Sequence, residues 1–338
     1  YLESESFSHL IGYVGPITRD ELKILFNRGY KSGDIIGKSG MERQYDSVLR
    51  GKDGRIFRTV DVKGRRIDAS IRDVETPSQG QNIVLTIDRN TQVLAEKALG
   101  NRIGSLIVLK PATGEILAMV SYPAFNANQL IEKGGNNFYA QLLADSRNPL
   151  INRAIQSIYP PASTFKTIMT AGIIEEKAFP LDEKVLCKGE IDYGDRVFRC
   201  WIRVPGHGRL DLSEALAQSC DVYFWEVGRD KFGIERIVSY SREFGFGQVS
   251  GIDLLGESAG LVPTPQWKER RFHEKWLGGD TLNLSIGQGY LLTTPLQVAN
   301  TMAMLVNDGV IYKPHLLKEI RDPLNGAVLS AVVPEVLL

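Results

Sequence analysis

Two short apolar runs separated by a turn constrain the fold more than any other feature of the sequence. The runs cover residues 105–109 and 115–121, and Pro111-Ala112-Thr113-Gly114 lies between them. Two such runs around a turn-forming segment predict a β-hairpin with a longer turn. They also form the most apolar stretch of the chain. Lys110 and Glu115 interrupt that stretch, so it is not a run of about 18 apolar residues that could span a membrane.

Helical segments are predicted on both sides of this hairpin. Residues 84–87 have the composition of a strand, and Asp88 is a suitable N-cap for a helix over residues 89–99. Further helices are predicted at residues 163–176, 212–232, 234–244 and 295–307. Strands followed mainly by helices predict an α/β (α+β) fold in which helices pack on an antiparallel sheet.

The first part of the chain differs from the rest. The 338 residues suggest two domains. Residues 1–80 are polar and rich in turns, with a capping-box pattern from Thr18 to Glu21 and an alternating run at residues 55–60. We therefore predict a small α+β module over residues 1–80 and a larger domain over residues 81–338.

Charge argues against one class of function. Lys and Arg total 40 and Asp and Glu total 40, so the formal net charge is zero. Nucleic-acid-binding domains usually carry a basic excess, and we expect no nucleic-acid partner. The sequence begins at Tyr1 without a signal peptide, and we expect a leader or membrane anchor to precede that residue.

Ser163-Thr164-Phe165-Lys166 is the strongest candidate for a catalytic motif. Pro160-Pro161 favours an extended entry that ends at the start of a helix. Residues three apart on a helix share a face, with Cβ atoms about 5–6 Å apart, so Lys166 can reach the Ser163 hydroxyl. Serine is a weak nucleophile until a neighbouring base takes its proton, and a neutral lysine can be that base. A four-residue pattern also arises by chance, so the motif needs support from its context.

Several motifs together resemble the penicillin-binding proteins and serine β-lactamases. Ser163-x-x-Lys166 matches the first motif of these families, and Ser219-Cys220-Asp221 matches the second, S-x-N, with Asp in place of the usual Asn. The S-x-D form is similar to class B enzymes of the penicillin-binding protein 2 type. The same resemblance is carried by Gly37-Lys38-Ser39-Gly40-Met41-Glu42-Arg43-Gln44-Tyr45-Asp46, Asn152-Arg153-Ala154, Tyr159-Pro160-Pro161, Gly206-His207-Gly208 and Gly287-Gln288-Gly289-Tyr290.

The third motif of the family, K-T-G, does not occur in the 338 residues. Lys166-Thr167, the one Lys-Thr pair, is followed by Ile168. In the family this motif lies on a sheet strand that supplies half of the oxyanion hole and contacts the substrate carboxylate. We expect that strand to follow Leu338 in the complete protein.

The resemblance implies a peptidoglycan D,D-transpeptidase of cell-wall elongation that is a target of β-lactams and needs no cofactor for catalysis. Ser163 would attack the carbonyl between the two terminal D-alanines of a stem peptide, and neutral Lys166 would take its proton. Ser219 and Asp221 would relay a proton to the leaving D-alanine and position the substrate. An amine of a neighbouring stem peptide would then resolve the acyl-enzyme into a cross-link.

The resemblance also implies the setting of the protein. The fold would be the penicillin-binding protein/serine β-lactamase-like transpeptidase fold, with residues 1–80 as a pedestal that is part of the non-catalytic dimerisation domain. The protein would work at the periplasmic, extracytoplasmic face of the cytoplasmic membrane, anchored by an N-terminal helix. Its substrates would include the lipid-linked precursor. Its partner would be a membrane glycosyltransferase of the SEDS family, which the pedestal would contact.

Three cysteines and a histidine form a possible metal site. Cys187, Cys200, His207 and Cys220 have the spacing C-x12-C-x6-H-x12-C, and a Cys₃His set suits tetrahedral structural zinc. The usual C-x2-C knuckle is absent, so a Cys187–Cys200 disulfide and three unrelated buried thiols are both alternatives. The segment resembles that of some penicillin-binding protein 2 enzymes that hold zinc with Asp or Cys, His and Cys ligands.

Two rival functions remain open at this point. Residues 161–166 closely resemble the first motif of class D serine β-lactamases, although a β-lactamase has no need of the module at residues 1–80. A non-catalytic β-lactam sensor or scaffold is the second rival, and the absence of K-T-G from these residues is its only support.

Overall fold

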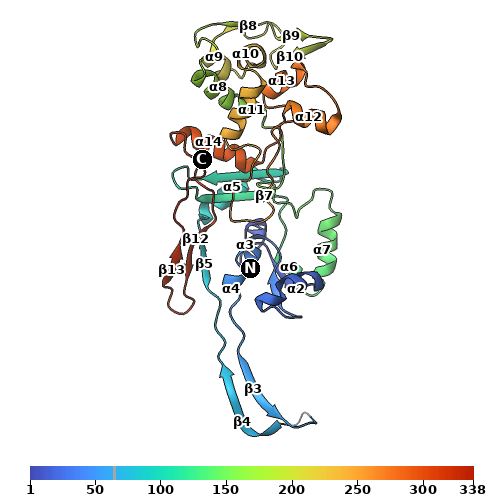
Figure 1. The fold of residues 1–338 in the computed structure, drawn as a ribbon, viewed down its shortest axis with the longest axis vertical. Helices are drawn as coiled ribbons and strands as arrows, with labels where there is room; N and C mark the ends of the chain where they lie inside the picture. The colour runs from blue at the N-terminus through green and yellow to red at the C-terminus, as the bar shows by residue number, and fades with distance from the viewer. Residues whose placement is uncertain (64–65) are drawn as a thin grey trace.

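The computed structural model describes residues 1–63 and 66–338 and has an elongated shape (Figure 1). Helices and short hairpins fill the upper end in this view, small sheets lie in the middle, and a long hairpin extends from the lower end. Residues far apart in the sequence meet in the middle, where β12 (Leu317–Arg321) pairs with β5 (Asn82–Leu85), the first strand after the N-terminal module.

The N-terminal module contains short elements and one long hairpin. Its capping box at Thr18 and Glu21 is present as predicted. Strands β1 and β2 pair antiparallel, as do β3 and β4, and the β3–β4 hairpin projects away from the rest of the molecule (Figure 1). In order, the elements are α1 (Ser8–Ile11), β1 (Val14–Pro16), α2 (Arg19–Leu25), η1 (Phe26–Arg28), β2 (Ile35–Gly37), α3 (Gly40–Gln44), α4 (Asp46–Leu49), β3 (Arg55–Val60) and β4 (Arg66–Glu75).

The middle of the molecule confirms the predicted hairpin. Its strands β6 (Gly104–Leu109) and β7 (Ile116–Tyr122) pair antiparallel, and helix α5 (Arg89–Leu99), capped by Asp88, packs against both. A second antiparallel sheet has the order β13-β12-β5, from β5 (Asn82–Leu85), β12 (Leu317–Arg321) and β13 (Val328–Ala331). Helices thus pack on antiparallel strands, as the sequence predicts.

The upper end is mainly helical around a large apolar core. Many elements contribute side chains to that core, which includes Phe165, Met169, Tyr223 and Phe224. Its elements, with those that lead to it, are α6 (Asn128–Ile131), α7 (Gly135–Ala144), η2 (Ala162–Phe165), α8 (Lys166–Glu175), β8 (Val185–Cys187), β9 (Glu190–Tyr193), β10 (Arg196–Arg199), β11 (Gly208–Leu210), α9 (Leu212–Ala217), α10 (Asp221–Val227), η3 (Gly228–Phe232), α11 (Ile234–Glu243), α12 (Pro265–Phe272) and α13 (Gly278–Ser285). Helix α14 (Pro295–Val306) follows them and packs on β6 in the middle of the molecule.

One helix predicted from the sequence is divided. The segment 212–232 forms α9, α10 and the π-helical turn η3 instead of one continuous helix. The chain leaves the helix at Ser219, whose φ of +52° is in the left-handed region. That region is uncommon for residues with a Cβ atom, so the break must be held by contacts from elsewhere in the fold.

A polar junction attaches the N-terminal module to the rest. We use the name junction for His9, Tyr45 and Asp253 and their partners. The Asp253 carboxylate accepts hydrogen bonds from the backbone N–H groups of Leu316 and Leu317, at 2.7 and 2.8 Å, and from the Tyr45 hydroxyl at 3.0 Å. The His9 ring lies 2.7 Å from the Pro149 carbonyl oxygen. Buried Leu10 and Met41 pack beside these groups on the core of the middle region.

Within residues 1–63 and 66–338, no helix has both the length and the apolar composition that crossing a membrane requires.

Candidate active site

Ser163 lies in a tight turn that precedes a helix. Residues 162–165 form the 3₁₀ helix η2, and α8 begins at Lys166. The Ala162 N–H donates to the Gly287 carbonyl oxygen at 2.9 Å, and a Cβ atom at Gly287 would lie only 2.3 Å from the Ala162 carbonyl oxygen. Gly287 therefore lets the 287–290 segment support the turn that presents Ser163.

Lys166 is fully buried behind the exposed Ser163 side chain. Its Nζ atom lies 3.3 Å from Ser163 Oγ, which confirms that the two residues share a face as predicted. The same nitrogen lies 2.6 Å from Asp221 Oδ1, 2.9 Å from the Ser219 carbonyl oxygen and 3.1 Å from Ser219 Oγ. One buried amine therefore contacts every other member of the predicted catalytic set.

Ser219 completes a hydrogen-bonded ring around the amine. Its hydroxyl donates to Ser163 Oγ at 2.9 Å. Asp221 begins α10, and burial raises the pKa of its carboxyl, while the contact with Lys166 acts in the opposite direction. We name Ser163, Lys166, Ser219 and Asp221 the serine–lysine cluster. The cluster places an accessible hydroxyl beside an amine and a second hydroxyl, which is the arrangement that nucleophilic acyl transfer requires.

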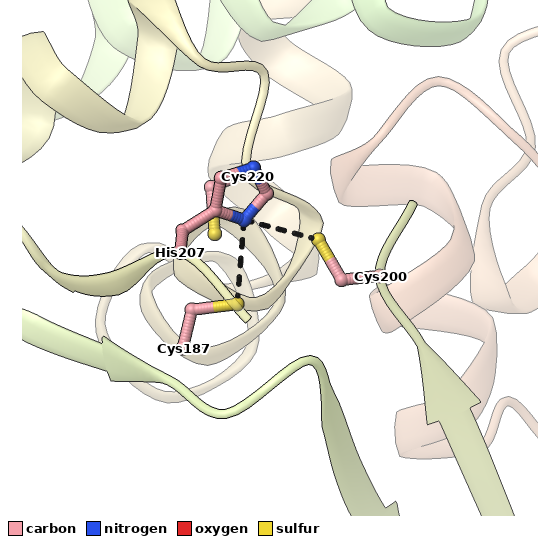
Figure 2. Close-up of side chains that lie close together, drawn as sticks. All are labelled: Cys187, Cys200, His207 and Cys220. Carbon is pink, nitrogen blue, oxygen red and sulfur yellow. Dashed lines mark hydrogen bonds between the residues drawn. The ribbon is translucent and has the colours of Figure 1, made fainter. Parts of the chain in front are cut away.

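Cys187, Cys200, His207 and Cys220 also converge, and we name them the thiol–imidazole cluster (Figure 2). Their possible ligand atoms all lie within 4.8 Å of one another. Cys187 ends β8, Cys200 follows β10, His207 precedes β11 and Cys220 caps α10. Gly206 allows the close approach, because a Cβ atom there would lie 2.4 Å from the Cys187 carbonyl oxygen.

The geometry of the thiol–imidazole cluster fits a tetrahedral metal ion. His207 Nδ1 lies 3.5 Å from Cys187 Sγ and 3.6 Å from Cys200 Sγ (Figure 2). A sulfur and a nitrogen bound to one zinc ion at about 2.3 and 2.0 Å lie roughly 3.5 Å apart in tetrahedral geometry. The three cysteines are free thiols, which does not support the Cys187–Cys200 disulfide. Their convergence also argues against three unrelated thiols.

Hydrogen bonds favour a thiolate within this cluster. The Cys220 thiol and nearby backbone N–H groups, including that of Asp221, lower the pKa of Cys200. A thiolate is the form of cysteine that binds metals. His207 Nε2 is buried and, among the described residues, has no hydrogen-bond partner. The cluster thus combines a cysteine that favours the thiolate form with a buried imidazole nitrogen that has no hydrogen-bond partner among the described residues.

The two clusters share one turn. Cys220 lies between Ser219 and Asp221, and the Asp221 backbone N–H donates to Cys200 Sγ at 3.4 Å. Any group held by the four donors would therefore hold the second catalytic motif as well.

One residue beside this turn escaped the sequence analysis. Trp201 follows Cys200, has 62% of its surface exposed, and donates from indole Nε1 to the Gln218 carbonyl oxygen at 3.1 Å. A tryptophan between two predicted ligands, Cys200 and His207, was the signal available in the sequence.

Family comparisons cover almost the whole chain. Residues 104–336 match the family described as "Penicillin binding protein transpeptidase domain", and residues 1–85 match "Penicillin-binding Protein dimerisation domain". The Peptidoglycan D,D-transpeptidase MrdA of Escherichia coli K12 is 36% identical over 324 residues, which cover 94% of this chain and 50% of that protein. The chain thus spans about half the length of the curated relatives it matches.

Solved structures are similar over the same extent. A complex between penicillin-binding protein 2 and MreC from Helicobacter pylori matches with a TM-score of 0.85 and 33% identity, covering 96% of this chain and 61% of that one. A structure titled "Structural coordination of polymerization and crosslinking by a peptidoglycan synthase complex" matches with a TM-score of 0.82 and 32% identity, covering 97% and 57%.

Proposed function

The chain belongs to the penicillin-binding proteins, with the transpeptidase fold of class B enzymes of the penicillin-binding protein 2 type, and on this basis we propose that it is a peptidoglycan D,D-transpeptidase of cell-wall elongation. One observation carries the proposal: Lys166 Nζ lies within hydrogen-bonding reach of both Ser163 Oγ and Ser219 Oγ. A base beside a nucleophile and a second hydroxyl beside both provide a route for the proton through the reaction.

In the first half of the reaction, Ser163 Oγ attacks the carbonyl carbon between the two terminal D-alanines of a stem peptide. Neutral Lys166 accepts the hydroxyl proton, and the backbone N–H of Ser163 can stabilise the oxyanion. The C–N bond breaks as a proton passes through Ser219, which lies 2.9 Å from Ser163 Oγ, to the leaving D-alanine. Asp221 holds the Lys166 amine in place, and the product is an ester at Ser163.

In the second half, the amine of a neighbouring stem peptide attacks the ester carbonyl. The same groups act in reverse, because the amine loses a proton to the Ser219–Lys166 pair and Ser163 regains one as the ester bond breaks. A new amide is formed, which is the cross-link. A β-lactam would acylate Ser163 by the first half-reaction and remain bound.

Covalent labelling of the full-length protein with a fluorescent penicillin tests this proposal. We expect one label per protein, mapped by mass spectrometry to Ser163, and no label in Ser163→Ala. Ser157→Ala, a matched change in the same segment, should label normally. Labelling at another residue, or normal labelling of Ser163→Ala, would refute the assignment.

The same experiment separates the two rival functions. A long-lived adduct supports a transpeptidase or a sensor, whereas rapid hydrolysis of a reporter cephalosporin would indicate a serine β-lactamase. Full biological function of Ser163→Ala in the cell would indicate a non-catalytic sensor or scaffold. Residues 1–85 favour the transpeptidase, because they match the penicillin-binding protein dimerisation domain.

We also propose that Cys187, Cys200, His207 and Cys220 hold a structural zinc ion. The Sγ–Nδ1 distances of 3.5 and 3.6 Å and the Cys₃His donor set support this ligand set. When bound, the ion would fix the turn at Cys220 and take no part in proton or acyl transfer. Metal analysis of purified protein should find one zinc per chain. Absence of zinc together with a Cys187–Cys200 cross-link in mass spectra would refute the site.

The expected setting follows from the family. We place a pedestal at residues 1–80 and the transpeptidase domain at residues 81–338, on the periplasmic side of the cytoplasmic membrane with an anchor before Tyr1. We expect the pedestal to contact a glycosyltransferase of the SEDS family. A photo-crosslinking residue at Ile24 or Phe26, which are 76% and 68% exposed on the pedestal, should capture that enzyme. The same residue at Val306, which is 74% exposed on α14, should not, and equal capture at the three positions would contradict the assignment.

A further inference from the structure

Two adjacent residues, Cys200 and Trp201, lie against the turn that carries Ser219. Cys200 Sγ accepts the Asp221 backbone N–H at 3.4 Å, and Trp201 Nε1 donates to the Gln218 carbonyl oxygen at 3.1 Å. The turn is thus held on both sides of Ser219, once before it and once after it. The Cys200 contact belongs to the thiol–imidazole cluster, whereas the Trp201 contact belongs to neither cluster.

Ser219 needs such support because its backbone is strained. Its φ of +52° is unfavourable for a residue with a Cβ atom and persists only where the surroundings fix it. Rotation of this backbone would move both groups that Ser219 contributes. These are the hydroxyl that donates to Ser163 Oγ at 2.9 Å and the carbonyl that accepts from Lys166 Nζ at 2.9 Å.

Trp201 is an unusual residue to find in this position. Its ring packs edge-on against His207, with centroids 5.4 Å apart, yet 62% of its surface is exposed, so burial gains little from so large a side chain. The polar edge of the indole is the part directed at the turn. Because Gln218 immediately precedes Ser219, a hydrogen bond to its carbonyl restrains the peptide unit that sets the Ser219 φ angle.

We propose that Trp201 is a positioning residue for acyl transfer, which acts through the Gln218 carbonyl to hold the Ser219 hydroxyl against Ser163. This inference rests on the proposed acyl-serine function and deepens it. In this proposal the indole N–H, as a hydrogen-bond donor, is the group that acts. If Trp201 were instead an apolar platform for substrate, the face of its ring would be the group that acts.

The test separates chemistry from binding in the full-length protein. Acylation by a fluorescent penicillin is followed over a range of concentrations, which yields the first-order acylation constant and the apparent dissociation constant of the preceding complex. Trp201→Phe keeps an aromatic ring and removes the N–H. We expect the acylation constant to fall roughly three- to tenfold, the effect of one lost hydrogen bond, with an unchanged dissociation constant and melting temperature.

The matched control is Trp276→Phe. Trp276 also uses its indole Nε1 as a donor, to Thr281 Oγ1 at 2.9 Å, and it lies outside both clusters. This variant should acylate at the wild-type rate. If the dissociation constant for penicillin rises in Trp201→Ala but keeps its wild-type value in Trp201→Phe, the ring serves as a platform for substrate, and the proposal is overturned. A lower melting temperature with both constants affected would indicate a structural role and overturn it as well.

A double-mutant cycle tests whether Trp201 acts through Ser219. If it does, Trp201→Phe should cause a much smaller loss of acylation rate in a Ser219→Ala background than in the wild-type protein, because only the contact of the residue 219 carbonyl with Lys166 is left to disturb. Independent, multiplicative losses would refute the proposal. Failure of the proposed acyl-serine function would give a different result, because the wild-type protein itself would then not be labelled at Ser163.

Discussion

The serine–lysine cluster and the junction both bury polar groups, but they use them differently. In the serine–lysine cluster an amine and a carboxylate face each other, with Lys166 Nζ 2.6 Å from Asp221 Oδ1. The hydroxyls of Ser163 and Ser219 contact the same amine. At the junction each polar side chain is matched to neutral partners. Asp253 accepts from two backbone N–H groups and from Tyr45, and His9 contacts a carbonyl oxygen.

This difference indicates what each region is for. An amine and a carboxylate around an accessible hydroxyl can move a proton, whereas a carboxylate that accepts hydrogen bonds from two backbone N–H groups and a tyrosine holds chain segments together. Changes in the serine–lysine cluster should therefore alter chemistry most, and changes at the junction should alter the free energy of unfolding most.

Lys166→Met should lower the rate of Ser163 acylation about a thousandfold, because the base is lost. It should also lower the free energy of unfolding by about 3 kcal/mol, since Asp221 loses its buried partner. Adding Asp221→Asn should restore most of that stability without restoring acylation. Kinetic labelling and urea unfolding measure the two effects, with exposed Lys188→Met as the control. If the double variant regained acylation, Lys166 would be only the buried partner of Asp221 and not the base for Ser163.

Cys187→Ser tests whether the thiol–imidazole cluster supports the chemistry from outside the catalytic turn. We expect loss of stoichiometric zinc, a lower melting temperature and an acylation rate reduced about tenfold, because the Cys220 anchor of the shared turn is weakened. Lys166→Met should retain its zinc. Metal analysis and kinetic labelling are the measurements. Full acylation activity in a zinc-free Cys187→Ser protein would show that the clusters are independent.

The junction should weaken in acid through His9. Burial, with a smaller effect from Arg153, lowers the pKa of His9 from 6.5 to about 4. The folded protein therefore disfavours the protonated ring, and the stability associated with neutral His9 is complete above pH 6.5 and is lost as the pH falls toward 4. The loss should reach up to about 3 kcal/mol. In His9→Phe the free energy of unfolding, measured with urea, should depend less on pH over this range. A pH dependence equal to that of the wild-type protein would contradict the assignment.

Asp253→Asn should lower the free energy of unfolding by about 2 kcal/mol, because a charged acceptor of two backbone N–H groups is lost. Tyr45→Phe removes one of its hydrogen bonds and should cost about 1 kcal/mol. Neither change should alter Ser163 acylation. Urea unfolding and kinetic labelling are the measurements, with the exposed Asp182→Asn as the control. A large loss of acylation at unchanged stability would mean that the junction takes part in the chemistry.

Local sequence signals predicted the elements that local interactions stabilise. Asp88 and Thr18 cap helices because their side chains reach N–H groups three residues away, and such contacts are visible in the sequence. The same is true of Ser163 and Lys166, whose contact depends on a spacing of three. The hairpin at residues 105–121 could likewise be predicted from local sequence alone, because its two apolar runs flank a turn-forming segment.

Features fixed by distant contacts could not be predicted in this way. The segment 212–232 contains no proline and was predicted as one helix, and the break at Ser219 is held by contacts from Lys166 and Trp201 elsewhere in the chain. Tyr45 and Asp253 are 208 residues apart in the sequence, and neither is part of a periodic pattern that would reveal their contact. The four members of the thiol–imidazole cluster were predicted from residue type, and the sequence already places Cys220 between Ser219 and Asp221, but only the fold shows that the four side chains converge.

The most direct test of the central claim is an exchange reaction followed by mass spectrometry. The full-length protein is incubated with a stem pentapeptide that ends in D-Ala-D-Ala and with an isotopically labelled D-amino acid as the acceptor amine. We predict release of one D-alanine, a transient acyl adduct on Ser163, and a new peptide that carries the labelled amino acid, all of which Ser163→Ala abolishes. Release of D-alanine with water as the only acceptor, or exchange that persists in Ser163→Ala, would contradict the account.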